Sequence, residues 1–533
     1  MMSKQHQSAL PIELAVGQKQ LYRFTGKYQA PPEIREALRQ YHLGGFTLFR
    51  SFNIEGPAQV RELTAGLQAE GAATGLPLLL IAADQEGGQL MTVGEGVTTF
   101  PGNMALGAAG SEELAYRAGH ATGLELAAMG INVNYAPVCD VNCNPRNPVV
   151  GTRSFGEDPQ LVARLAAAMV SGLQAAGVAA TAKHFPGHGD TSSDSHYGSP
   201  RLDHDINRLR QVELLPFAAA VEAGVRLVMS AHISLPALND GMDLPATLSP
   251  NILRGLLRKE MGFEGVTVSD AMDMGAIQQG DNLVIDAIAA AKAGVDLLLL
   301  NFEPAIQTRL SAALLQAARR GLLSAEDVLQ SGQRILSLKG WLGQQIQPEL
   351  SVVGCPEHRA LADEIAARAL TLVQDREKLL PLRLRPEDRL AVIVPEPQDL
   401  TPADTSSTVH PSLAQAIQSY HPHLDEFVIP LNPSEADIAG LRAQAGNYKL
   451  IIFASFNATQ FPAQAQLANV LLETGRPLIA AALRLPYDLQ AYPAVGTYLC
   501  TYSILPPAMQ ALAAGLWGKI PIPGRLPVSL PVL

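Results

Sequence analysis

The chain lacks several features that would assign it to other classes of protein. Only four of its 533 residues are cysteine, and none of them forms a CxxC pair. This excludes a disulfide scaffold and a cysteine-based zinc site. The formal net charge is −11, with no block of lysine or arginine. We therefore expect neither nucleic acid nor an anionic membrane as a partner.

Long apolar runs are also missing. The longest, such as "PLLLIAA" (77–83) and "VDLLLL" (295–300), are far shorter than the roughly 20 residues that span a bilayer. The opening "MMSKQHQSALPIELAVGQ" has no cationic segment followed by an apolar one, which is the pattern of a secretory signal. These absences predict a cytoplasmic location.

What is present is the composition of a globular protein with substantial cores: 47% of the residues are hydrophobic and 17% charged. In the first two thirds, short β-branched runs alternate with longer Ala/Leu-rich amphipathic stretches, which is typical of βα units. The pattern predicts an α/β fold, with a (β/α)8 TIM-type barrel over residues 1–342. The eight predicted strand runs are "LYRFTG" (21–26), "GGFTLF" (44–49), "PLLLIAADQEGG" (77–88), "INVNYAPVCDV" (131–141), "GVAATAKHFPGHG" (177–189), "RLVMSAHIS" (226–234), "GVTVSDAM" (265–272) and "GVDLLLL" (294–300).

A second, smaller domain follows the predicted barrel. The periodicity is lost near residues 343–358, which indicates a linker. Residues 359–533 then alternate strand and helix patterns again, which predicts an α/β sandwich with helices on both faces (αβα). No GxGxxG or GxxxxGK[ST] motif occurs in the chain, and we predict no cofactor. The predicted strands of this domain are "RLAVIVPE" (389–396), "KLIIFASFN" (449–457), "PLIAAAL" (477–483) and "TYLCTYS" (497–503).

Polar residues recur where the predicted barrel strands end. In a barrel these positions meet at the carboxyl-terminal face, where the βα loops build active sites. Any one of them could instead be the N-cap of the following helix, but five on one rim favour a site. They are Asp84-Gln85-Glu86, Asp140, Lys183-His184, His232 and Asp270.

One loop, "KHFPGHGDTSSDSHYGSP" (183–200), holds three of the twelve histidines. His184, His188 and His196, with the nearby aspartates, are possible metal ligands. However, Phe185-Pro186-Gly187 prevents the helix that would place the first two on one face. We therefore predict no metal site. The structural alternative is that these histidines only satisfy loop backbone groups.

The third interpretation of this loop is that its residues carry out acid/base catalysis. Asp194 stands two residues before His196, so its carboxylate can accept one ring N–H and stabilise the imidazolium. The other ring nitrogen can then donate a proton near neutral pH, because the reference pKa of histidine is about 6.5. Asp270, at the end of "GVTVSD" (265–270), has the position of a nucleophile.

Several motifs in the same order resemble glycoside hydrolase family 3, specifically its β-N-acetylglucosaminidase branch. They extend over nearly the whole chain, and together they are highly specific. The segments are "DQEGG" (84–88), "NYAPVCDV" (134–141), "GTRSFGEDP" (151–159), "KHFPGHGD" (183–190), "DSHYGSP" (194–200), "AHISLPAL" (231–238), "PATLSPNILRGLLRKEMGFEGVTVSDAMDMGAI" (245–277) and "GRLPVSLP" (524–531).

The resemblance implies an exo-acting enzyme that removes N-acetylglucosamine from small glycosides or oligosaccharides, with cell-wall fragments among the expected substrates. The reaction would be retaining, through a covalent glycosyl-enzyme. Asp270 would be the nucleophile, His196 the acid/base and Asp194 the residue that orients His196. Asp190 and His188 would only shape the loop. The implied contacts to sugar hydroxyls are Asp84, Arg153, Lys183 and His184.

One departure leaves the sugar open. The branch usually has an arginine four residues after "DQEGG", where this chain has Thr92, and threonine offers no cationic fork. A β-glucosidase or β-xylosidase with the same mechanism is therefore an alternative. So is a glycoside phosphorylase, because a histidine that has donated its proton is neutral and repels phosphate less than a carboxylate does. From other classes, a metal-dependent barrel hydrolase or a silent sugar-binding protein stays open.

Overall fold

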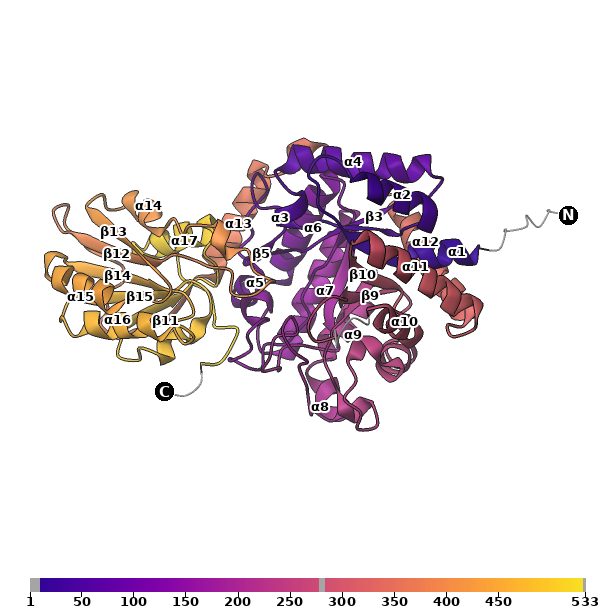
Figure 1. Cartoon of the computed structure of the whole chain (residues 1–533). Helices are drawn as coiled ribbons and strands as arrows, with labels where there is room; N and C mark the ends of the chain where they lie inside the picture. Colours follow the sequence, from indigo (N-terminus) through magenta and orange to yellow (C-terminus); the bar gives the residue numbers. More distant parts are fainter. Residues whose placement is uncertain (1–9, 278–282, 531–533) are drawn as a thin grey trace.

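A closed barrel of eight parallel strands forms the larger part of the computed structural model, which describes residues 10–277 and 283–530 (Figure 1). Each strand overlaps one of the eight predicted runs, and strands neighbouring in sequence pair around the barrel. The prediction of a TIM-type barrel is confirmed. Its strands are β1 (Gln20–Arg23), β2 (Gly45–Thr47), β3 (Leu80–Ala83), β6 (Val133–Asn134), β7 (Ala179–Phe185), β8 (Leu227–Ser230), β9 (Val266–Ala271) and β10 (Leu297–Asn301).

Local sequence signals set the ends of the barrel helices. The Ser111 hydroxyl accepts the N–H of Leu114 at the start of α6, which satisfies one of the free donors of the first turn. Gly130, at φ 77°, turns the chain from α6 into β6. None of the described helices is long and apolar enough to cross a membrane. The helices of this part are α1 (Ile12–Gln18), α2 (Pro32–Tyr41), α3 (Arg50–Asn53), α4 (Pro57–Ala73), α5 (Asn103–Ala109), α6 (Glu112–Ala128), α7 (Pro159–Ala175), α8 (Ile206–Gln211), α9 (Leu215–Glu222), the π-helical η4 (Asn251–Glu260), α10 (Leu283–Ala293), α11 (Pro304–Arg319) and α12 (Ala325–Leu342).

The interior of the barrel is packed with strand side chains. Helix α12 adds Ile335, Leu338 and Leu342 to the cluster that contains Leu21 and Leu227. Burial of these apolar side chains stabilises the barrel, by about 1.5–3 kcal/mol for each that is fully buried. A two-stranded ribbon follows β3 at the carboxyl ends of the barrel strands. It consists of β4 (Gln85–Gly87) and β5 (Leu90–Met91).

The second part is a six-stranded sheet in the order β11-β16-β15-β14-β12-β13, with β11 antiparallel and the other strands parallel (Figure 1). Helices α14 and α17 pack on one face and α15 and α16 on the other, so the predicted αβα sandwich is confirmed. Its elements are β11 (Thr371–Asp375), β12 (Leu390–Pro395), α14 (Leu413–Gln418), β13 (Leu424–Ile429), α15 (Glu435–Gln444), β14 (Leu450–Ser455), α16 (Pro462–Leu472), β15 (Leu478–Ala482), β16 (Thr497–Cys500) and α17 (Pro506–Leu516).

Helix α13 (Pro356–Ala369) connects the two parts, and it contacts α5 and α6 of the barrel as well as α17 of the sandwich. It begins inside the segment predicted as a linker, so the boundaries at 342, 343–358 and 359 stay a prediction. Residues 1–9 of the predicted barrel domain and 531–533 of the second domain, including the end of "GRLPVSLP", lie outside the described residues.

Candidate active site

A cavity of about 730 Å³ lies at the carboxyl ends of the barrel strands. Six of the seven residues predicted for the site line this cavity. They come from β7, from β9, and from the loops that follow the barrel strands. The seventh, Asp194, lies behind the cavity wall, where it binds His196. The six that line the cavity are Asp84, Arg153, Lys183, His184, His196 and Asp270.

Asp270 lies near the end of β9, and its Oδ1 accepts the N–H of Ala271 at 2.8 Å. Burial by itself raises the pKa of this carboxyl. The nearby imidazoles of His184, His232 and His196, together with the Ala271 N–H, outweigh burial and hold the pKa below its ordinary value. Asp270 is therefore an anion at neutral pH, as a nucleophile must be.

His196 and Asp194 form a dyad within the loop. The Asp194 Oδ1 lies 2.6 Å from Nδ1 of His196 and also accepts the His196 backbone N–H at 2.9 Å. Burial raises the pKa of the Asp194 carboxyl, but these bonds to His196 lower it more, so it stays ionised. A carboxylate only accepts hydrogen bonds, so Nδ1 of His196 carries a proton and Nε2 is the nitrogen free to exchange one.

A group of two buried cations and two carboxylates, of which Glu86 is buried and Asp84 half-buried, forms one wall of the cavity. Lys183 Nζ lies 2.6 Å from both Asp84 Oδ1 and Glu86 Oε1, and Arg153 binds Glu86 through Nε and Nη2 at 2.9 and 2.8 Å. Burial raises the pKa of Glu86, but Arg153 and Lys183 lower it to about 2. Glu86, noted in the sequence only as a polar rim residue, is thus the anion that fixes both cations.

His184 is held by partners that set its tautomer. Its Nδ1 lies 2.7 Å from Asp140 Oδ2, and its Nε2 lies 3.3 Å from Arg153 Nη2. Because an arginine only donates, Nε2 accepts and Nδ1–H donates to Asp140. Asp140 also accepts the backbone N–H of His188 at 2.6 Å, which fixes the start of the loop. Both ring nitrogens of His188 bind hydroxyls of the same loop.

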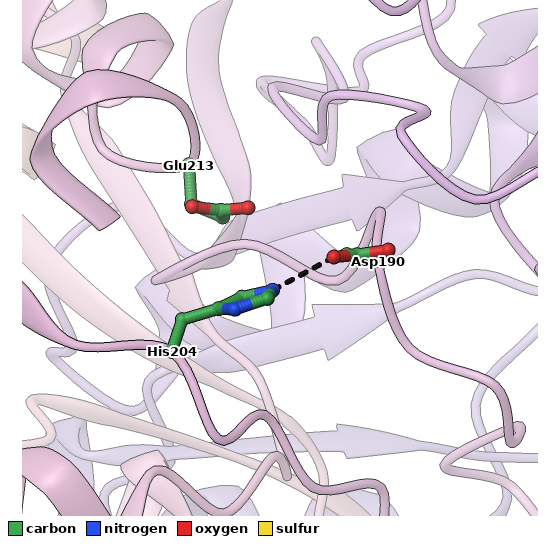
Figure 2. Close-up of side chains that lie close together, drawn as sticks. All are labelled: Asp190, His204 and Glu213. Atoms are coloured by element: carbon green, nitrogen blue, oxygen red, sulfur yellow. Dashed lines mark hydrogen bonds and ion pairs between the residues drawn. The ribbon is translucent and has the colours of Figure 1, made fainter. Parts of the chain in front are cut away.

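A second group of side chains ties the ends of the segment that carries the dyad. His204 Nε2 lies 2.7 Å from Asp190 Oδ2, and Glu213 points toward the same space (Figure 2). Among the described residues, these three are the one group of possible ligands that lie close enough together to hold a metal ion. His184, His188 and His196, the possible metal ligands named from the sequence, form no such group there. Arg208 already supplies a positive charge here, with Nη1 at 3.0 Å from Glu213 Oε1.

The space beside Thr92 contains a cation that sequence reasoning missed. The buried Thr92 hydroxyl donates to the Asp84 carbonyl at 2.9 Å. The half-buried Arg50 lines the cavity next to it and donates from Nη1 to the Met91 carbonyl at a long 3.4 Å. Arg50 directly follows the predicted run 44–49, and that rim position was the signal that could have found it.

A loop of the second domain, residues 399–408, forms part of the cavity wall. The Thr405 backbone N–H and hydroxyl donate to the Gln89 carbonyl at 2.8 and 3.0 Å. Arg484 binds both Gln89 Oε1 and Asp404 Oδ2 at 2.6 Å. These bonds hold the second domain against the barrel rim, so both domains shape the cavity.

The chain is similar to known proteins over most of its length. The family model "Glycosyl hydrolase family 3 N terminal domain" matches residues 13–338. The chain is 35% identical to a β-hexosaminidase A of Pseudoalteromonas piscicida and 30% identical to a β-N-acetylglucosaminidase/β-glucosidase of Cellulomonas fimi; each match covers 94% of this chain and 91% of the relative. A solved glycoside hydrolase family 3 β-N-acetylglucosaminidase from Paenibacillus sp. str. FPU-7 superposes with a TM-score of 0.92 at 39% identity, covering 98% of this chain and 100% of that one.

Proposed function

Because the chain belongs to glycosyl hydrolase family 3 and is a glycoside hydrolase, we propose that it is a retaining, exo-acting β-N-acetylglucosaminidase. It removes terminal N-acetylglucosamine from small glycosides, with cell-wall fragments in the cytoplasm as the expected natural substrates. The observation that carries the proposal is that His196, bound to Asp194, lines the same cavity as Asp270.

In the first step the Asp270 carboxylate attacks the anomeric carbon while Nε2 of His196 protonates the glycosidic oxygen. The carbon–oxygen bond breaks, the aglycone leaves as an alcohol, and a glycosyl ester forms on Asp270. The pKa of Asp270, held below its ordinary value by the surrounding imidazoles, keeps the nucleophile ionised. Asp194 stabilises the imidazolium that His196 needs before the transfer.

In the second step His196, now neutral, removes a proton from water at Nε2. The water oxygen bonds to the anomeric carbon, and Asp270 leaves as a carboxylate. Two displacements at the same carbon retain its configuration. Throughout, the 2.6 Å bond from Nδ1 to Asp194 keeps the same ring nitrogen facing the substrate.

Substrate binding is proposed for the residues that line the wall: Asp84, Lys183, His184 and Arg153. We add Arg50, whose guanidinium has one long hydrogen bond and no carboxylate within ion-pair distance in the described parts of the chain. The cavity volume, about 730 Å³, lies in the usual range for small-ligand sites. This size and the low aromatic content, 5%, favour a short exo-acting site over a long groove of stacking platforms.

A β-glucosidase activity is the second candidate, and two observations favour it: the relative from Cellulomonas fimi carries both activities in its name, and Thr92 stands where a cation is expected. Phosphate in place of water is a further alternative for the second step. Its negative charge would meet a neutral His196 and the guanidinium of Arg50.

The proposal is tested with a panel of p-nitrophenyl β-glycosides, assayed with and without phosphate at matched ionic strength. We expect the highest kcat/KM on the N-acetylglucosaminide, and no turnover by Asp270→Asn under the same conditions. Higher kcat/KM on the glucoside would favour the second candidate. Sugar 1-phosphate as the main product would identify a phosphorylase. Loss of activity on chelation would instead support a metal-dependent hydrolase.

A further inference from the structure

A second cavity, of about 480 Å³, lies at the other end of the barrel. It contains Lys19, which precedes β1, and Asp296, which precedes β10, so it opens at the amino ends of the strands. The catalytic cavity lies at their carboxyl ends, and the two share no lining residue. Nothing in the glycosidase mechanism uses this space.

The lining of this cavity is strongly basic, although the chain as a whole has a net charge of −11. Cationic side chains come from four segments and outnumber the carboxylates by three. The cations are Lys19, Arg254, Arg258, Lys292 and Arg334, and the carboxylates are Asp296 and Asp327.

Both carboxylates are already engaged by arginines. Asp296 accepts from Arg258 Nη2 at 2.6 Å and from Arg334 Nη2 at 2.7 Å, and Asp327 accepts from Arg254 Nη1 and Nη2 at 3.0 and 2.9 Å. These pairs neutralise two of the five charges at most. The excess positive charge therefore belongs to the cavity as a whole.

Lys19 is the cation that most strongly indicates a ligand, because its ammonium is buried. It donates to the Val295 carbonyl at 2.8 Å and to Ser331 Oγ at 2.7 Å, and no carboxylate of the described chain lies within ion-pair distance. An ammonium has three N–H groups, so one remains for a ligand. Burial lowers the pKa of Lys19 to about 8, with Asp296 opposing and Arg334, Arg254 and Arg258 adding to the effect.

The rim adds features that suit a small organic anion. Lys292 is exposed and has no ion-pair partner in the described residues. Leu322, 62% exposed, and the buried Leu323 provide an apolar edge beside it. A ligand with one strongly anionic group and a small body would contact both kinds of surface.

We propose that this cavity is a binding site for a small phosphate-bearing molecule, remote from the catalytic cavity. A phosphate group has several acceptor oxygens and up to two negative charges, which match the free ammonium donors and the uncompensated positive charge. An anion next to Lys19 would offset the cost of burying its charge. The volume is sufficient for a metabolite larger than the phosphate group itself.

Inorganic phosphate is the probe for the test, by calorimetric titration and thermal shift of the whole chain, with chloride matching the ionic strength. We expect saturable binding that Lys292→Ala weakens by up to about fivefold, the upper end of the range for an exposed charge pair, and Lys292→Glu weakens further. The matched control is Lys259→Ala, an exposed lysine on η4 that does not line the cavity; it should bind like the parent. Arg50→Ala tests for binding at the catalytic cavity.

Sulfate serves for the pH dependence because its charge does not change between pH 7 and 10. As the pH rises through about 8, Lys19 loses its proton, so affinity for sulfate should fall and follow one titrating group. Absence of saturable phosphate binding would overturn the proposal. So would loss of binding in Arg50→Ala with no change in the Lys292 variants, which would place the phosphate in the catalytic cavity.

Discussion

Replacement of His196 by alanine separates the two halves of the proposed mechanism. The variant keeps the Asp270 nucleophile but removes the only proton donor that we assign to the leaving oxygen. An alkyl aglycone leaves poorly as an alkoxide, whereas dinitrophenolate needs almost no protonation. The two kinds of substrate should therefore respond very differently.

The expected magnitudes follow from the dyad. General acid catalysis contributes about 10²- to 10⁴-fold, so His196→Ala should lower kcat/KM on alkyl β-N-acetylglucosaminides by about that factor. On the dinitrophenyl glycoside the loss should stay below about tenfold. Asp194→Ala leaves the imidazole but removes its 2.6 Å partner. It should also lower kcat/KM on the alkyl glycosides, by no more than His196→Ala does.

The assay compares both substrates for parent, His196→Ala, Asp194→Ala and the control Ser193→Ala. Ser193 is exposed on the same loop, so its replacement should leave both rates unchanged. Equal losses on the two leaving groups would refute the acid/base assignment. The dyad would then be a structural pair, or a ligand pair if metal content fell in parallel.

Three further outcomes are expected. Arg50→Ala should raise KM about tenfold or more with a smaller change in kcat, because it removes a charged hydrogen-bond donor from the cavity; an unchanged KM would remove Arg50 from the substrate site. His204→Ala breaks the bond to Asp190 and should make residues 191–203 more sensitive to limited proteolysis and lower kcat; equal sensitivity would show that the tie is not needed. Burial raises the pKa of Asp488 to about 7, so the protonated form stabilises the fold below about pH 4 and this contribution is lost as the pH rises to about 7. Asp488→Asn should flatten this part of the pH profile of Tm, and an unchanged slope would contradict the burial argument.

Much of the fold could be predicted because barrel strands such as β3 and β8 are buried along their whole length and read as short apolar runs. In the second domain, two strands lack such an apolar run and could not be predicted from it. Strands β11 and β13 lie at the two edges of their sheet, and β13, "LDEFVI", is partly exposed along most of its length. An edge strand with charged residues has no apolar run to detect, so both strands were missed.

The site was predicted to the extent that its residues stand in local motifs. Asp194 and His196 are two residues apart, so their contact could be inferred from spacing alone. The contact of Gln89 with Thr405 joins residues 316 apart, and no local pattern encodes it. The rim position of Arg50 can be read from the sequence, but its place beside Thr92 depends on how two separate βα loops pack together.

Identification of the covalent intermediate tests the central claim most directly. A slow 5-fluoro glycosyl fluoride of N-acetylglucosamine, followed by digestion and peptide mass spectrometry, should place one glycosyl group on Asp270 of the parent chain and none on Asp270→Asn. A glycosyl group on another residue, or continued turnover of substrate by Asp270→Asn, would contradict the account.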